Sequence, residues 1–178
     1  MAQAPAGEHF EHRDWSLAFN RGADGERFTL DEALAAEALL LGRRTYDLFA
    51  GAWPDRDGPL ADKYNSMPKY VVSATLTDPA WNNTHVVTGD LVTEVAGLRD
   101  ALAGEIQVPG SIQLVRALLA GDLVGEIRLL TLPVVLGTGR RLFGPAPGRT
   151  RWRLAGTRTV GEGLPITVFH RHRADPAT

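Results

Sequence analysis

The 178-residue chain contains no cysteine. Disulfides, thiolate metal ligands and cysteine nucleophiles are therefore excluded, and the absence suits a reducing cytoplasm. No apolar run approaches the ~20 residues that a membrane span requires. The opening residues, MAQAPAGEHFEHRDW, have no apolar core. We therefore expect no signal peptide, no membrane partner and a cytoplasmic protein.

A strong charge of either sign is also lacking, because the formal net charge is −2. This balance does not indicate a nucleic-acid partner. The hydrophobic fraction of 44% and the charged fraction of 22% are typical of a globular protein. The length leaves room for one domain with a sizeable core. We expect residues 1–178 to form a single domain.

Candidate metal ligands are few. His9 and His12 stand beside Glu8 and Glu11, but this segment has no regular period and no further ligand cluster follows it. Metal sites in proteins need three or four such ligands held together. We therefore expect no metal site.

What the sequence does contain is a glycine between a buried strand and a helix, at residues 39–46 (LLLGRRTY). An apolar run of this kind is typical of a buried strand, and Gly42 ends it. Arg43, Arg44 and Thr45 then open a short helix. Guanidinium groups bind phosphate oxygens in a bidentate way, so the turn suits a phosphate ligand. The structural alternative is an ordinary turn followed by solvated arginines.

The same arrangement recurs in residues 106–120, where IQVPGS precedes IQLVRALLA. Gly110 lets a ligand approach the backbone, and the free N–H groups at the start of the following helix can bind an anion. Taken alone, Gly110 is as well explained by turn geometry. Two such turns in one chain favour a ligand with more than one phosphate.

Strands and helices alternate along most of the chain. The pattern predicts helices at residues 30–38, capped by Thr29 or Asp31, and at 43–49, 60–66, 92–103 and 111–120. It predicts strands at 38–41, 69–73, 84–88, 105–108, 126–136, 152–160 and 165–172. Such alternation indicates an α/β fold with a mostly parallel sheet flanked by helices. The last two strands, joined by a glycine turn, indicate an antiparallel C-terminal edge.

Five segments in order carry a family resemblance: LLLGRRTYDLFAGAWP, KYVVS, WNNT, GS before LVRALL, and LPVVLGTGRRLF. Together they resemble the dihydrofolate-reductase-like family. They are most similar to the branch that contains the reductase domain of the bifunctional riboflavin-biosynthesis deaminase/reductase. The resemblance covers residues 39–169. It implies a central sheet flanked by helices, a nicotinamide cofactor and hydride transfer to a small heterocyclic or phosphoribosyl substrate.

The resemblance also implies which residues bind NADPH, or NADH in its place. The phosphate-contacting turn is matched by Gly42, Arg43, Arg44 and Thr45. The serine near the adenosine 2′-phosphate is matched by Ser73, the glycine turn under the pyrophosphate by Gly110 and Ser111, and a late turn near the site by Gly137 and Gly139.

Three departures from the family pattern stand out. Members begin with a strand that lies in the middle of the sheet, and Met1 falls where that strand has already ended. The strands starting near Ala38 and Ile127 are therefore expected to face a vacant slot, which leaves costly unpaired edges. A late start, a truncation, a degraded protein or a strand recruited from another chain would each explain it. In addition, Ala74 replaces an arginine and Pro109 replaces a glutamate.

No proton donor is assigned from the sequence. Asp31 and Glu32 fall near the position where dihydrofolate reductases place an acid on the first helix, but aspartate is also a preferred helix cap. The first hypothesis is therefore an NADPH-dependent oxidoreductase, homodimeric by family habit and impaired by the missing strand. The alternative is a nucleotide-binding or regulatory protein that retains the fold without turnover.

Overall fold

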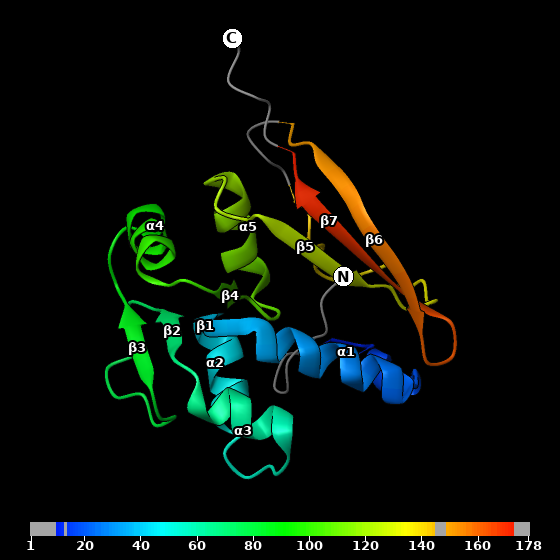
Figure 1. The fold of residues 1–178 in the computed structure, drawn as a ribbon, viewed down its shortest axis with the longest axis horizontal. Helices are drawn as coiled ribbons and strands as arrows, with labels where there is room; N and C mark the ends of the chain where they lie inside the picture. Colours follow the sequence, from blue (N-terminus) through cyan, green and yellow to red (C-terminus); the bar gives the residue numbers. More distant parts are fainter. Residues whose placement is uncertain (1–9, 13, 145–148, 173–178) are drawn as a thin grey trace.

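The computed structural model describes residues 10–12, 14–144 and 149–172 (Figure 1). The elements follow in the order η1 Trp15–Ala18, α1 Gly22–Ala35, β1 Ala36–Gly42, α2 Arg43–Ala50, α3 Pro59–Ser66, β2 Lys69–Val72, β3 Thr84–Val87, α4 Leu91–Ala101, β4 Glu105–Gln107, α5 Ile112–Ala120, β5 Glu126–Leu130, β6 Trp152–Val160 and β7 Leu164–Arg171.

Four strands form a parallel sheet in the order β3-β2-β1-β4. Helices cover both of its faces, so the centre of β1, Ala38–Leu41, is a continuous buried apolar run rather than an alternating one. Leu39 and Leu41 pack into the core shared with α1, α2 and α3, whereas Leu40 packs with α4 and α5 on the other face. Figure 1 shows these two helix layers on opposite sides of the sheet. The predicted α/β class, with a parallel sheet flanked by helices, is confirmed.

The C-terminal strands form a separate antiparallel sheet in the order β5-β7-β6, which confirms the predicted antiparallel part. The glycine turn at 161–163 joins β6 to β7. The prediction of one strand over residues 126–136 is wrong, because β5 ends at Leu130. Pro133 lacks the N–H that a continued strand would need, and proline is excluded from paired strand interiors for this reason.

Helix α1 is longer than predicted and begins at Gly22 rather than Leu30. Asp31 is not its cap, since it lies inside the helix and accepts a bond from Arg27 at 2.7 Å. Gly25 lies inside this helix for a packing reason, although glycine has a low helix propensity. A Cβ at Gly25 would lie 3.3 Å from Cγ2 of Val160, so the glycine allows α1 to pack closely against β6.

Among the residues that the structure describes, the two sheets do not pair with each other. Among the strands of the described residues, β4 is bonded to β1 and β5 is bonded to β7, so β4 and β5 are both edge strands. A cavity of about 1450 Å³ lies between them. The expectation that the strand at Ala38 borders the slot is wrong, because β1 is paired on both sides. β4 borders the slot instead, and the expectation for the strand at Ile127 agrees with the position of β5.

Lys69 is fully buried at the start of β2. Its Nζ donates to the carbonyl oxygens of Asn65 at 3.0 Å and Met67 at 2.7 Å, and lies 4.5 Å from the centre of the Trp81 ring. Burial lowers the pKa of Lys69 to about 8 from 10.5. Between these two pKa values Lys69 is deprotonated in the folded protein and still protonated in the unfolded chain. The free energy of unfolding therefore rises with pH across this interval.

We expect the free energy of unfolding to rise by about 2 kcal/mol between pH 7 and pH 9.5 through this one group. Lys69→Met should lack that rise, because it retains the side-chain volume without the titration. Urea unfolding of both proteins at the two pH values measures the difference. The upper limit lies below the pKa of Tyr64, which burial raises to about 12. Equal pH slopes in the two proteins would contradict the expectation.

Candidate functional site

The candidate site lies where the four parallel strands end. β1 leads through Gly42 into α2, and β4 leads through Pro109, Gly110 and Ser111 into α5. β2 ends before Ser73, and β3 leads into α4. Because the strands are parallel, these turns share one edge of the sheet, which is where α/β proteins bind ligands.

Hydrogen bonds join the turn after β1 to the turn after β4. The Gly42 N–H donates to Ser111 Oγ at 3.0 Å, and Ser111 Oγ donates to Thr45 Oγ1 at 2.9 Å. A Cβ added to Gly110 would lie 3.7 Å from Thr45 Oγ1. The structure therefore brings together four of the predicted residues, Gly42, Thr45, Gly110 and Ser111, from segments almost 70 positions apart.

The turn before α5 has an unusual backbone. Gly110 and Ser111 have successive positive φ angles of 63° and 53°. A non-glycine residue in this region costs of order 1–3 kcal/mol and persists only where its surroundings hold it. Here the two hydrogen bonds of Ser111 Oγ hold it. Such strained conformations cluster at ligand sites, so this turn is the part of the sheet edge that most strongly indicates ligand binding.

Arg43 connects the turn after β1 to the turn after β2. Its Nε bonds Asp47 Oδ1 at 2.9 Å, and its Nη1 lies 3.5 Å from Thr75 Oγ1. Ser73 Oγ accepts the N–H groups of Thr75 and Leu76 at 3.2 and 3.1 Å. Arg43 and Ser73 thus belong to the same edge, and Arg44 is exposed on the first turn of α2.

Gly137 and Gly139 lie apart from these contacts, in the loop of residues 131–144. Both have positive φ angles, 71° and 107°. α5 anchors the loop, since Arg116 donates from Nε to the Leu142 carbonyl at 3.2 Å and also bonds the Arg141 carbonyl. Leu136 and Leu142 line the cavity that Gly110 also borders. The loop is therefore near the site through the cavity that it shares with Gly110.

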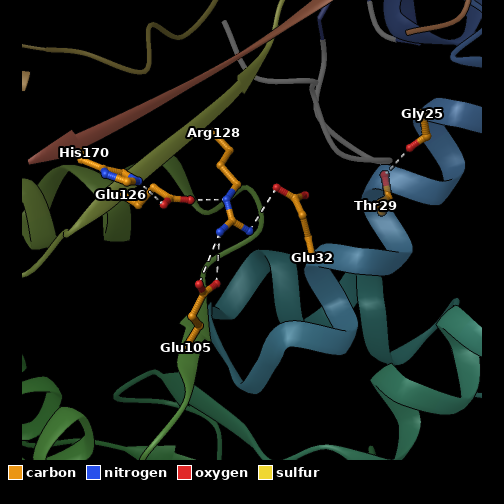
Figure 2. A network of polar contacts seen from close by, with 7 residues as sticks. All are labelled: Gly25, Thr29, Glu32, Glu105, Glu126, Arg128 and His170. Carbon is orange, nitrogen blue, oxygen red and sulfur yellow. Dashed lines mark hydrogen bonds and ion pairs between the residues drawn. The ribbon is translucent and has the colours of Figure 1, made fainter. Parts of the chain in front are cut away.

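Sequence reasoning missed a charged cluster around Arg128 on β5 (Figure 2). Its Nη1 lies 3.4 Å from Glu32 Oε1, its Nη2 lies 3.2 Å from Glu105 Oε2, and its Nε bonds Glu126. Glu126 also contacts His170 at 2.8 Å. Burial raises the pKa of Glu32, while the positive charge of Arg128 opposes the rise. No sequence pattern predicts this cluster, because its members come from four separate elements, α1, β4, β5 and β7.

The Arg128 cluster and the turns after β1 and β4 lie at opposite ends of the parallel sheet. Glu32 stands on the last turn of α1, just before β1 begins, whereas Gly42 ends β1. Seven strand residues span roughly 20 Å. Glu32 therefore bonds Arg128 away from the candidate site, and no proton donor is assigned there.

No group of three or more histidine, aspartate or glutamate side chains is placed to hold a metal ion in the residues that the structure describes. His9 lies outside those residues. No helix among them is long and apolar enough to cross a bilayer.

Comparison with known proteins gives several relatives of similar length. YyaP of Bacillus subtilis strain 168, an uncharacterized protein, is 30% identical over 139 residues, which cover 75% of this chain and 73% of YyaP. YwjB of the same organism, also uncharacterized, is 24% identical over 155 residues, which cover 86% of this chain and 83% of YwjB.

Solved structures share the fold. A candidate riboflavin biosynthesis protein of Shewanella sp. PV-4 superposes with a TM-score of 0.72 at 26% identity, covering 90% of this chain and 88% of the other. A pyrimidine reductase-like protein of Corynebacterium diphtheriae superposes with a TM-score of 0.58 at 15% identity, covering 87% and 83%. The family model of the RibD C-terminal domain matches residues 7–166. The chain therefore belongs to the RibD C-terminal domain family, which confirms the resemblance carried by its five sequence segments.

Proposed function

We propose that this protein is an NADPH-dependent reductase that transfers hydride to a small heterocyclic or phosphoribosyl substrate. The observation that carries the proposal is the joined edge formed by Gly42, Thr45, Gly110 and Ser111. Family membership supports the same reaction class. The absence of cysteine suits a cytoplasmic location as part of this proposal.

The residues at this edge fit a dinucleotide. Gly110 has no side chain to block a pyrophosphate from the backbone, and the first turns of α2 and α5 offer free N–H groups to its oxygens. Arg43 and Arg44 add positive charge beside Gly42. When bound, the nicotinamide supplies the hydride. The protein's own residues then hold the phosphates, orient the ring and shape the substrate pocket.

Arg43 is the residue that would favour NADPH over NADH. Ala74 stands where the family resemblance implies an arginine, but the Arg43 guanidinium lies beside Thr75 and supplies a positive charge in that turn. A charged hydrogen bond to the 2′-phosphate contributes ~1.5–3 kcal/mol. Arg43→Ala should therefore raise the Kd for NADPH about ten- to hundredfold and leave NADH unchanged.

Fluorescence titration of both nucleotides measures this effect. Arg27→Ala is the matched control, because Arg27 forms the same exposed pairing with an aspartate four residues later. Its NADPH affinity should not change. An equal loss of NADH affinity in Arg43→Ala would show that Arg43 does not read the 2′-phosphate.

The substrate class is the less specific part of the proposal. A phosphoribosylamino-uracil or a pterin would suit the family, and the Shewanella relative carries a name from riboflavin biosynthesis. The direct test is NADPH oxidation followed at 340 nm with a panel of such compounds. A nucleotide panel in a thermal-shift assay precedes it, since a ligand that binds only the folded state raises the melting temperature.

One observation favours a second candidate, a nucleotide-binding protein without turnover. The cavity between β4 and β5 borders Gly110, so a wide cavity adjoins the proposed cofactor site on that side. Pro109 also replaces the glutamate of riboflavin reductases. NADPH binding with no oxidation of NADPH across the substrate panel would favour this candidate over the reductase.

We further propose that the protein is a homodimer. Several large apolar side chains are exposed near the antiparallel sheet, including Val135 at 96% and Phe143 at 55%. Two-fold dimers are the commonest way to cover such surface. Light scattering at micromolar concentration should give twice the monomer mass. The Val135→Asp variant should instead give the mass of a single monomer. Leu17→Asp, at another exposed apolar residue, is the control. A monomeric unmodified chain would refute the proposal.

A further inference from the structure

The small net charge of the chain conceals a strong segregation of charge along it. Residues 1–126 contain 10 lysines and arginines against 19 aspartates and glutamates, whereas residues 127–178 contain 9 against 2. Between Glu126 and Glu162 there are seven arginines and no acidic residue. A segregation of this kind indicates an anionic partner for the C-terminal part of the protein.

Arginine and histidine side chains meet where β6 begins and β7 ends, on the hairpin drawn in orange and red in Figure 1. The two strands are antiparallel, with Arg153 opposite His170. The pairing continues one step further, because the His172 N–H donates to the Arg151 carbonyl at 3.0 Å. Side chains two positions apart on a strand share a face, so these four residues lie on one face of the hairpin. Together with Arg149 they are called the arginine face.

The arginine face has hydrogen-bonding capacity that the protein does not use. Arg149, Arg151 and Arg153 are all exposed. Within the described part of the chain, none of their guanidinium groups pairs with a carboxylate, and Nη2 of Arg153 instead lies 3.4 Å from Nδ1 of His170. A guanidinium carries five N–H donors. Each of the three is therefore available to an anion from solvent.

Two acidic side chains close to this face already have partners. Glu126, opposite His170 on the neighbouring strand β5, bonds Arg128 and contacts His170 at 2.8 Å. Asp122 bonds Arg171 at 2.7 Å. Neither carboxylate pairs with an arginine of the face, which leaves a local positive potential there.

The chemistry and the spacing of the face favour a single-stranded nucleic acid over other polyanions. Guanidinium groups bind phosphate oxygens in a bidentate way. Residues two apart on a strand are separated by ~6.8 Å, and neighbouring phosphates of an extended single strand have a similar repeat. Planar guanidinium and imidazole groups also stack on unpaired bases, which an acidic peptide lacks. Anionic membranes are bound by clusters of about 4–8 lysines and arginines, which is more than this face provides.

We propose that the arginine face binds single-stranded nucleic acid through its phosphates, without sequence specificity. Arg149, Arg151 and Arg153 bind the phosphates, and the imidazole rings of His170 and His172 offer stacking surfaces to the bases. None of these residues belongs to the parallel sheet or to its turns. The inference is therefore independent of the proposed reductase, and either can fail without the other.

Fluorescence anisotropy of the full chain with a labelled oligouridylate of about 12 nucleotides tests the proposal, since small single-strand binders cover sites of this size. Non-specific binding predicts a Kd of ~1–100 μM at physiological salt. Three phosphate contacts on a single strand give a slope of about −2 for log K against log salt. The Kd should then rise roughly twentyfold between ~50 and ~200 mM NaCl. No binding in this range, or a Kd that does not depend on salt, would overturn the proposal.

Charge reversal of the Arg151 and Arg153 pair locates the binding surface. Arg151→Glu with Arg153→Glu should raise the Kd at least about tenfold and reduce the slope to about −0.7, since one phosphate contact remains. The matched control is Arg27→Glu with Arg99→Glu, which changes the net charge equally at exposed arginines of α1 and α4. Its Kd should change less than about twofold, because salt screens distant charges. An equal loss in both double variants would assign binding to the overall charge and overturn the proposal.

A charge-conserving variant and two competitors complete the test. Arg151→Lys with Arg153→Lys should keep most of the salt slope, because it retains both charges. Loss of binding in this variant with an unchanged Tm would contradict phosphate contacts of the kind proposed. Decaglutamate should displace the oligonucleotide far less effectively than unlabelled oligouridylate of equal charge. Equal displacement, or binding to phosphatidylserine vesicles that unlabelled oligouridylate does not reverse, would overturn the assignment to nucleic acid.

Discussion

The Gly110→Val variant is expected to lose NADPH binding while it remains folded. Gly110 has a φ of 63° and begins the turn that Ser111 ties to Gly42. A valine there adds methyl groups over the backbone that the pyrophosphate would approach. Losing two or more charged hydrogen bonds, each worth ~1.5–3 kcal/mol, should raise the Kd about a hundredfold or more.

A control variant at a second glycine, Gly58, distinguishes the loss of stability caused by the backbone conformation from the loss of NADPH binding. Gly58 also has a positive φ, 102°, and a Cβ there meets no atom within 4 Å. Gly58→Val should therefore lose stability of order 1–3 kcal/mol and retain NADPH affinity. Calorimetric titration and thermal unfolding of both variants measure the two effects. Unchanged affinity in Gly110→Val, or an equal loss in both variants, would remove Gly110 from the cofactor site.

The largest expected effect on stability comes from Trp81→Ala. Trp81 is 3% exposed, and its ring contacts those of Tyr46 and Phe49. Its Nε1 donates to Asn65 Oδ1 at 2.8 Å. Removing a buried tryptophan costs ~3–5 kcal/mol through the lost burial and the cavity left behind. This is a large fraction of the ~5–15 kcal/mol that stabilises a typical domain.

Trp152→Ala is the matched control for this prediction. Trp152 is half-buried on β6, and its ring stacks with the Arg171 guanidinium at 5.7 Å. Its removal should cost at most about 1–2 kcal/mol, since surface contacts of this kind contribute little. Urea unfolding followed by circular dichroism compares the two variants. A similar loss in both would show that the aromatic cluster around Trp81 is not the centre of the core.

Several helix boundaries were predicted to within one residue, and α2, α3 and α5 reached this without a side-chain cap. α4 does have a cap, since the side chain of Asp90 accepts the Thr93 N–H at 3.0 Å. α1 was placed too late, because Gly22 and Gly25 lower its helix propensity. Gly25 lies against Val160, from a strand more than 130 positions away. That contact overrides propensity, and no local pattern contains it.

The candidate site was also only partly predictable from the sequence. Glycine turns after apolar runs predicted Gly42 and Gly110, and parallel pairing then requires both turns to share one sheet edge. The hydrogen bonds from Ser111 to Gly42 and Thr45 depend on the side-by-side placement of β1 and β4. The Arg128 cluster could not be predicted, because its ion pairs join four elements that are separate in the chain.

The sequence by itself determined the local units of this protein: the strand-glycine-helix segments, the helices that follow β1 and the closing hairpin. Periodicity and turn chemistry decide these units within a few residues. Only the tertiary structure decided that β4 and β5 face each other across a cavity, that β1 is paired on both sides, and that Arg128 bridges the two sheets. The physical reason is that strand pairing depends on which edges meet after the chain has folded, and neighbouring residues do not encode that choice.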